Sequence, residues 1–203
     1  MLLKKMHRND EQRGFTLIEL LVVIGIIVVL SVVVVLTLNP SELLRQARDS
    51  GRLSDLGTIK TAITLYVADS SNPNLASSSA AYAGCYLSVS SGTGTTTTKC
   101  GYFTNGSITT NVSSSAANYR KTDSTGWLPV NLSAISGGTP LSVLPIDPAS
   151  SDPMNYYYAY AANSSLLFEI DARLESTKYR NSLVSSEGGN NTSTYEVGTI
   201  LSL

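Results

Sequence analysis

The residues from Phe15 to Leu38 form an apolar stretch of 24 residues that contains one charged side chain, Glu19. As an α-helix this stretch is about 36 Å long, enough to span a bilayer core of about 30 Å. It therefore predicts a transmembrane helix. A carboxylate at the centre of a membrane costs about 2.5–3.5 kcal/mol. Glu19 is either a tolerated charge near the interface, about 6 Å from Phe15, or a carboxylate that pairs with a partner cation.

The segment ahead of this stretch, residues 1–14, is short and basic. Its charged residues are Lys4, Lys5, Arg8 and Arg13 against Asp10 and Glu11. Because basic residues stay on the cytoplasmic side, we expect a single-pass membrane protein with a cytoplasmic N-terminus and an exported C-terminal domain. A secretory signal peptide is cut at small residues after its apolar region. Here the small residue, Gly14, lies before that region, so the apolar helix is expected to be retained.

The run Arg-Gly-Phe-Thr-Leu-Ile-Glu-Leu-Leu-Val-Val-Ile-Gly-Ile-Ile, residues 13–27, resembles the N-terminus of type IV prepilins and of type II secretion pseudopilins. The resemblance implies that a prepilin peptidase cuts after Gly14 and that the new N-terminus, Phe15, is N-methylated. It also implies that Glu19 pairs with the N-terminal amine of a neighbouring subunit. The implied partners are the peptidase, identical or homologous subunits, membrane lipid, and an inner-membrane assembly platform with its ATPase machinery.

The composition sets limits on the rest of the chain. Without residues 1–14 the chain keeps 10 basic and 13 acidic side chains, a net charge of −3. This balance gives no support to a nucleic-acid-binding surface. About 165 residues follow the membrane helix, which is enough for one domain with a modest core. A charged fraction of only 14% suits an exported domain rich in strands and loops.

Two cysteines, Cys85 and Cys100, lie in the part that is expected to be exported. An oxidising compartment favours a disulfide between them. The closed loop of about 16 residues would contribute about 3 kcal/mol by the chain-entropy estimate. Two free thiols or half of a metal site are the alternatives. The only histidine, His7, lies in the leader, so no histidine remains to complete a zinc site.

A second helical segment, amphipathic and continuing the first, is expected over residues 39–69. Asn39-Pro40-Ser41-Glu42 has the pattern of a helix start. Pro40 should therefore kink or loosen a continuous helix from Phe15 to Ala68. Apolar residues recur at helical spacing at Leu53, Leu56, Ile59, Ile63 and Val67. Helix-compatible charge pairs are Glu42/Arg45, Arg45/Asp49 and Arg52/Asp55.

Residues 70–203 are expected to form the exported, β-rich domain. The candidate strands are Gly84–Val89, Gly101–Phe103, Tyr156–Ala161, Leu166–Glu175 and Thr194–Leu203. In Leu166–Glu175 apolar and charged residues alternate, which predicts one face packed on a helix and one face in water. The charged set is Glu169, Asp171, Arg173 and Glu175. The predicted fold class is α+β and pilin-like, with a long N-terminal helix packed on a small antiparallel sheet.

No catalytic set is present in the sequence, so we do not expect an enzyme. Asp147 and Asp152 are candidate calcium ligands, although both precede a proline and fit turns equally. No other metal or cofactor is expected. The resemblance implies a structural subunit of a type IV pilus-like filament. The alternatives are a major pseudopilin of type II secretion, a minor tip subunit for adhesion or DNA uptake, and an enzyme anchored by the helix.

Overall fold

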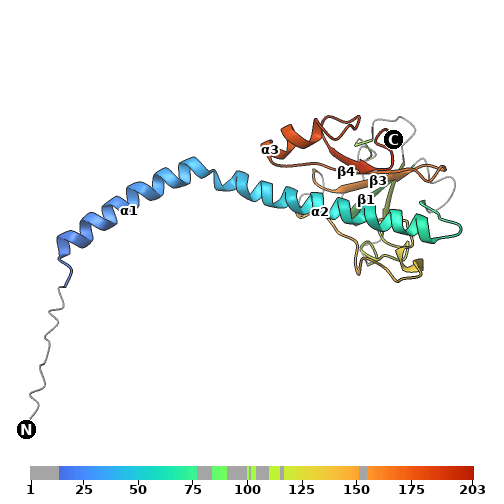
Figure 1. Ribbon diagram of the computed structural model, residues 1–203, viewed down its shortest axis with the longest axis horizontal. Helices are drawn as coiled ribbons and strands as arrows, with labels where there is room; N and C mark the ends of the chain where they lie inside the picture. The colour runs from blue at the N-terminus through green and yellow to red at the C-terminus, as the bar shows by residue number, and fades with distance from the viewer. Residues whose placement is uncertain are drawn as a thin grey trace, which may run out of the picture. The chain divides into compact units, whose positions relative to one another are not determined.

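A computed structural model describes residues 14–76, 84–90, 100, 102–103, 110–114, 117–150 and 155–203. The chain divides into two compact units, Met1–Pro40 and Ser41–Leu203. Helix α1 (Leu17–Leu38) belongs to the first, and helix α2 (Pro40–Asp69) runs into the second (Figure 1). Asn39 separates the helices with a left-handed φ of 43°. Residues before proline avoid the α-helical region, so the predicted kink at Pro40 takes the form of a helix break.

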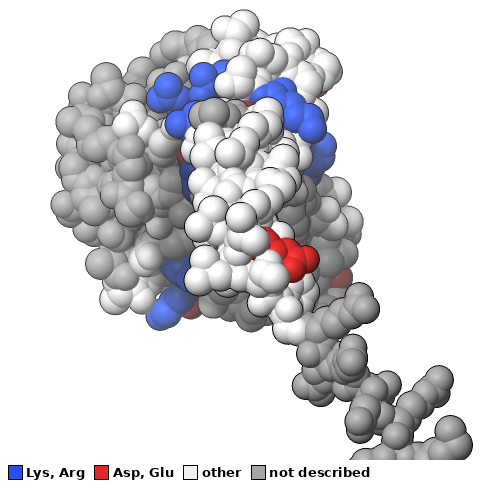
Figure 2. Space-filling view, turned by 90° about the vertical axis from the view of Figure 1, so that its left-hand side faces the viewer, with Lys and Arg blue, Asp and Glu red and all other residues white. Residues whose placement is uncertain are grey.

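Helix α1 leaves its described apolar side chains exposed. Its described large apolar side chains are exposed by 46% at Val23 to 82% at Leu17. The segment Leu17–Val35 is long and apolar enough to cross a membrane. Uncharged side chains cover most of the described surface on the face that Figure 2 shows. Such a helix favours an apolar environment, either lipid or other helices.

The second unit contains a five-stranded sheet in the order β2-β1-β3-β4-β5. The strands are β1 (Gly84–Ser90), β2 (Thr110–Ser114), β3 (Tyr158–Ala162), β4 (Phe168–Ala172) and β5 (Tyr195–Gly198). The pairs β1–β3, β3–β4 and β4–β5 are antiparallel, which confirms the predicted fold class. The edge strand β2 pairs with β1 in parallel, which the sequence did not indicate. The strand expected at Gly101–Phe103 is wrong where it is described, because Tyr102 lies in a turn and Phe103 in coil.

Three short helical segments complete the described part of the fold. A 3-10 turn, η2 (Leu132–Ala134), precedes β3. A single turn, α3 (Thr177–Tyr179), and a π-helical turn, η3 (Arg180–Val184), lie between β4 and β5. The Ser176 hydroxyl caps α3 by accepting a hydrogen bond from the Tyr179 amide.

Helix α2 packs on one face of the sheet and forms the main core (Figure 1). Leu56, Ile59 and Ile63 are fully buried, as their spacing predicts, whereas Leu53 and Val67 lie half-buried at the margin. The sheet and the loop between β2 and β3 contribute aliphatic side chains and five large aromatic ones: Tyr86, Trp127, Tyr158, Tyr160 and Phe168. The tyrosines after Asn155 are thus largely core residues: Tyr157, Tyr158 and Tyr160 are all buried.

The other face of the sheet is also covered, which corrects the prediction of a charged face in water. A second cluster of buried residues lies there: Cys85, Leu87, Val89, Cys100, Phe103, Tyr157, Ala159, Ala161 and Leu203. Glu169 and Asp171, the predicted solvent-facing acids of β4, are fully buried. The cause is long-range, because the C-terminal end of the chain folds back and the Leu203 amide donates to Glu169 Oε2 over 2.8 Å.

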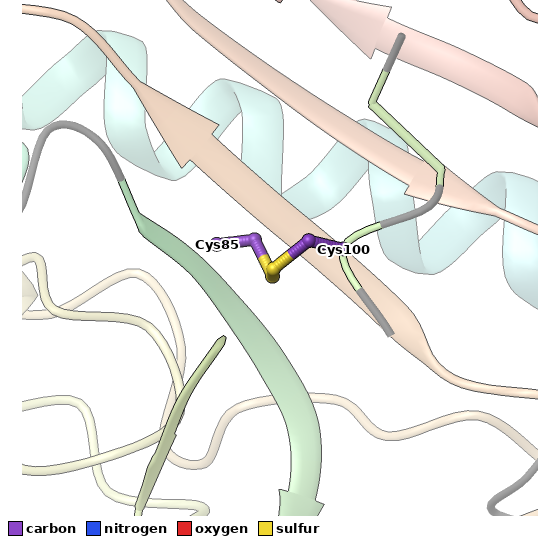
Figure 3. Close-up of a disulfide and its surroundings, with 2 residues drawn as sticks. All are labelled: Cys85 and Cys100. Atoms are coloured by element: carbon purple, nitrogen blue, oxygen red, sulfur yellow. A yellow bond between two sulfur atoms is a disulfide. The ribbon is translucent and has the colours of Figure 1, made fainter. Parts of the chain in front are cut away.

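Cys85 of β1 and Cys100 form a disulfide with a Cα–Cα distance of 5.7 Å (Figure 3). Both residues belong to the second cluster. The Phe103 amide donates to the Cys100 carbonyl over 3.1 Å, so the bridge anchors the turn that brings Phe103 over the sheet. Most of the enclosed loop, residues 91–99, lies outside the described residues.

We expect the double substitution Cys85→Ser and Cys100→Ser to lower the free energy of unfolding by about 3 kcal/mol. The unfolded chain gains freedom when the cross-link is lost, and the covering turn loses its anchor. Urea unfolding of both proteins measures the effect, and non-reducing mass spectrometry of the wild type should detect the linked peptides. Free thiols in exported wild-type protein would contradict this expectation.

Candidate functional site

The N-terminal segment is built around a short extended stretch followed by a capped helix. Gly14, Phe15 and Thr16 precede α1 and are not helical. Thr16 is the N-cap: its φ of −79° and ψ of 150° are extended, and its Oγ1 accepts a hydrogen bond from the Glu19 amide over 3.2 Å. A threonine at this position satisfies one of the free amides of the first turn. The peptide bond after Gly14 is therefore in exposed, non-helical backbone.

Glu19 lies in the first turn of α1 and is exposed. A carboxylate there interacts favourably with the helix dipole. The other polar side chains of α1, Ser31 and Thr37, donate to carbonyls of their own helix at 2.7 and 2.9 Å. Among the described residues Glu19 forms no ion pair. Ser31 and Thr37 are thus bonded within α1, whereas the charge of Glu19 has no described ion-pair partner and can bind a group outside the chain.

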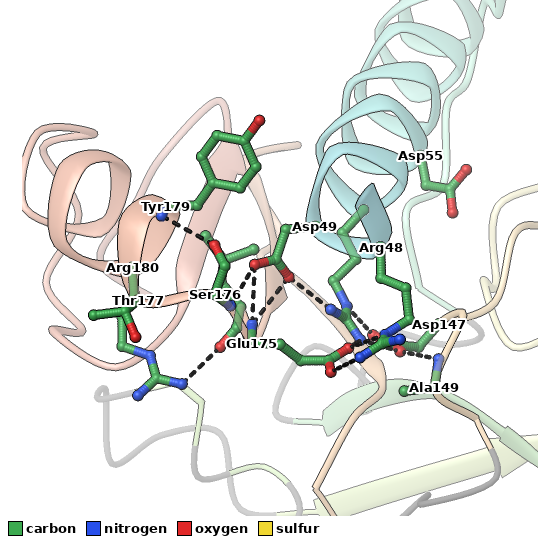
Figure 4. A network of polar contacts seen from close by, with 12 residues as sticks. Arg48, Asp49, Asp55, Asp147, Ala149, Glu175, Ser176, Thr177, Tyr179 and Arg180 are labelled. Atoms are coloured by element: carbon green, nitrogen blue, oxygen red, sulfur yellow. Dashed lines mark hydrogen bonds and ion pairs between the residues drawn. The ribbon is translucent and has the colours of Figure 1, made fainter. Parts of the chain in front are cut away.

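A buried ionic network holds the N-terminal half of α2 in the second unit (Figure 4). Its centre is Arg52, whose side chain is fully buried. Arg52 donates from Nε and Nη2 to the two carboxylate oxygens of Asp147, each over 2.7 Å. Its Nη1 donates to Asp49 over 2.6 Å, and its Nη2 lies 2.7 Å from Glu175. The guanidinium also lies 5.1 Å from the centre of the Tyr156 ring.

The same network binds the chain just after β4. Asp49 accepts hydrogen bonds from the amides of Glu175 and Ser176, the latter over 2.7 Å. Arg48 donates from Nε to Glu175 over 2.8 Å. The hydrogen bond from Arg48, assisted by Arg52, lowers the pKa of Glu175 to about 2 despite partial burial. Burial lowers the pKa of Arg52, but its ion pairs, foremost with Asp147, outweigh burial and raise it. Both groups therefore stay charged.

The network changes two predictions for these residues. Arg52 pairs with Asp49 and not with Asp55, which instead accepts a 2.7 Å hydrogen bond from the Tyr158 hydroxyl. Both oxygens of Asp147 are bound by Arg52, and one also accepts from the Ala149 amide over 2.8 Å. The candidate calcium ligand Asp147 is thus already neutralised by a cation. The other candidate, Asp152, lies outside the described residues.

Comparison with known proteins identifies the N-terminal segment. Residues 10–35 match the family model of the prokaryotic N-terminal methylation motif. Neither the curated proteins nor the solved structures provide a match to this chain. The match contains Gly14, Phe15 and Glu19 and ends within α1.

The fold and this motif together define a class of protein. The chain has an α+β fold with an N-terminal apolar helix, which fits a membrane-anchored protein. It carries the signature of type IV pilin-like and pseudopilin-like proteins. The motif indicates a structural protein that is a substrate of a prepilin peptidase and assembles with pilin-like subunits.

Proposed function

We propose that this chain is a structural subunit of a type IV pilus-like filament. In this proposal a prepilin peptidase cuts between Gly14 and Phe15, and the mature subunit is held in the membrane by α1. Subunits then assemble through α1 on an inner-membrane platform driven by an ATPase. The exported unit, Ser41–Leu203, forms the outer part of each subunit. The methylation motif at residues 10–35 supports the processing step.

The observation that carries the proposal is the charge of Glu19, which forms no ion pair among the described residues. The described large apolar side chains of its helix are all exposed. In lipid the carboxylate is unfavourable by a few kcal/mol. Cleavage after Gly14 creates a new amine at Phe15, only four residues from Glu19 and therefore at a similar depth. When helices bundle, the amine of one subunit pairs with Glu19 of its neighbour. The relief of the unpaired charge then favours assembly over the isolated subunit.

We expect Glu19→Gln and Glu19→Ala to reduce filament yield at least tenfold while leaving membrane insertion and the exported unit intact. The measurement is the amount of subunit in sheared filaments, at matched membrane levels of the mature protein. Ser31→Ala is the control, because it removes a polar group of α1 that is already bonded within its own helix. If Glu19→Ala gives the same filament yield as wild type, the pairing role is wrong and Glu19 is a tolerated charge near the membrane interface.

A further inference from the structure

The end of the exported unit at which α2 begins carries two exposed leucines. Leu43 and Leu44, in the first turn of α2, are 51% and 62% exposed. Leu43 is five residues past Leu38, where α1 ends. Because an extended chain spans at most about 3.6 Å per residue, Leu43 stays within about 18 Å of the end of α1, whatever the backbone angle at Asn39. Chain connectivity therefore keeps both leucines close to the segment Leu17–Val35, which is long and apolar enough to cross a membrane.

The short helical turn α3 lies at the same end of the exported unit (Figure 1). Glu42 Oε1 accepts a hydrogen bond from the Thr177 amide over 2.9 Å, which holds α3 beside the first turn of α2. The next residues include two exposed cations, Lys178 and Arg180. Tyr179 lies half-buried between them, with Lys178 Nζ 5.9 Å from the centre of its ring. The start of α2 and α3 thus bring apolar, aromatic and basic side chains together.

The exposed charge at this end is positive, because the acids there are bonded within the fold. The side chains of Glu42 and Glu175 are 20% and 8% exposed, whereas that of Arg45 is 50% exposed. Arg45 lies 3.8 Å from Glu42, which is a weak pair at a protein surface. In the part of the chain that the structure describes, neither Lys178 nor Arg180 has an ion-pair partner. Figure 2 views the molecule from this end, and more Lys and Arg than Asp and Glu surface is in view.

The exposed leucines and cations form one patch, the docking rim: Leu43, Leu44, Arg45, Lys178 and Arg180. We propose that the docking rim binds anionic phospholipid headgroups and so seats the exported unit on the membrane before assembly. This inference rests on the membrane anchor of the proposed function, but not on the formation of a filament. The contact is released when the subunit leaves the membrane.

A lipid surface offers what each part of the docking rim needs. Guanidinium and ammonium groups bind phosphate oxygens, and leucine side chains enter the boundary between headgroups and acyl chains. The amphipathic ring of Tyr179 suits the same depth. Since Leu43 is tethered close to the end of α1, the unit meets this surface without a search through solution. Each cation near an anionic surface should favour the docked state about fivefold.

The test places the full chain in nanodiscs of phosphatidylcholine, alone or with about 30% phosphatidylglycerol to make the surface anionic. Both contain a trace of lipid with a gadolinium-labelled headgroup, which speeds the relaxation of nearby amides. We expect the enhancement at the Lys178 and Arg180 amides to be at least threefold larger in the anionic nanodiscs. The Thr64 amide, about 36 Å along α2 from Pro40, should show no such difference. About 0.5 M NaCl should remove the difference by screening.

Neutral variants separate the cations from the tether. The triple substitution Arg45→Gln, Lys178→Gln and Arg180→Gln should lower the enhancement in anionic nanodiscs to its value in neutral ones. Glutamine keeps a donor for the Leu174 carbonyl, to which Arg180 Nη2 donates over 3.0 Å, so the fold should be retained. Lys60→Gln is the control: it removes a cation about 30 Å along α2 from its start and should leave docking unchanged.

The outcomes distinguish docking from assembly. Glu19→Gln should dock like wild type, so a failure of filament formation leaves this inference standing. Equal enhancement in the two kinds of nanodisc overturns it, and the wild-type comparison decides this even where a variant fails to fold. If the triple variant loses filament yield while the wild type shows no lipid dependence, the cations bind a neighbouring subunit and the inference is wrong. A chain that does not insert into nanodiscs overturns both the docking and the proposed function.

Discussion

Replacing Arg52 by methionine should lower the free energy of unfolding by about 3–5 kcal/mol and Tm by roughly 10 °C. The substitution removes the guanidinium that Asp49, Asp147 and Glu175 share and leaves three carboxylates close together, with Arg48 as the remaining cation of the network. Asp49 and Asp147 are almost completely buried, so water cannot replace the lost partner. Urea or thermal unfolding of the detergent-solubilised chain measures the change.

Arg45→Met on the same helix is the matched control. Arg45 is half-exposed and lies 3.8 Å from Glu42, so its loss should cost less than about 1 kcal/mol. Arg52→Lys should lie between the two, because an ammonium cannot bind both oxygens of Asp147 in parallel. The double substitution Arg52→Met with Asp147→Asn should lower the free energy of unfolding by less than the sum of the two single substitutions. Each substitution removes the partner of the other residue. If Arg52→Met and Arg45→Met lower the free energy of unfolding equally, the network does not stabilise the fold.

The general fold could be predicted because its signals are local. The apolar run of α1 and the three- and four-residue spacing of Leu56, Ile59 and Ile63 each lie within one helix. The hairpin between β3 and β4 also depends on neighbouring residues: the Asn163 side chain accepts from the Ser165 and Leu167 amides, as turn asparagines do. In each case neighbouring residues decide the structure.

The role of Arg52 could not be predicted, because its partners are distant in sequence. Local charge spacing paired Arg52 with Asp55, but the fold brings Asp147, 95 residues away, into bidentate contact with Arg52. Only the tertiary arrangement assigns Asp55 to the Tyr158 hydroxyl, 103 residues further on. The one available signal was that Arg52 lies four residues before Leu56, on the helix face that becomes buried.

The buried acids of β4 were missed for a related reason. Strict alternation correctly places Glu169 and Asp171 on the face opposite Phe168 and Ile170. Alternation alone, however, does not say whether a second layer covers that face. The cover comes from the disulfide-anchored turn at Phe103 and from Leu203. Both residues lie in coil, at the ends of segments whose sequences suggested strands. A face that is polar in the sequence is therefore not necessarily exposed to water.

Replacing Gly14 by valine should block processing and leave the full-length precursor in the membrane. In the structure a side chain added at Gly14 meets no atom within 4 Å, and the residue is exposed and not helical. The substitution therefore has no steric reason to disturb α1 or the exported unit. Any loss of cleavage must arise where the peptidase binds the backbone beside the scissile bond. Intact mass of the membrane-bound protein measures it, with more than about nine-tenths of the variant expected to remain uncut.

Gly25→Ala is the control for this result. A side chain at Gly25 also meets no atom within 4 Å, but the residue lies inside α1, well past the proposed cleavage site. It should be processed like wild type, and N-terminal sequencing of both proteins should begin at Phe15. A Gly14→Val protein that is still shortened to Phe15 would show that the enzyme does not require glycine there. A wild-type chain cut after Leu38 would instead mean that α1 is removed, and assembly through Glu19 would then be impossible.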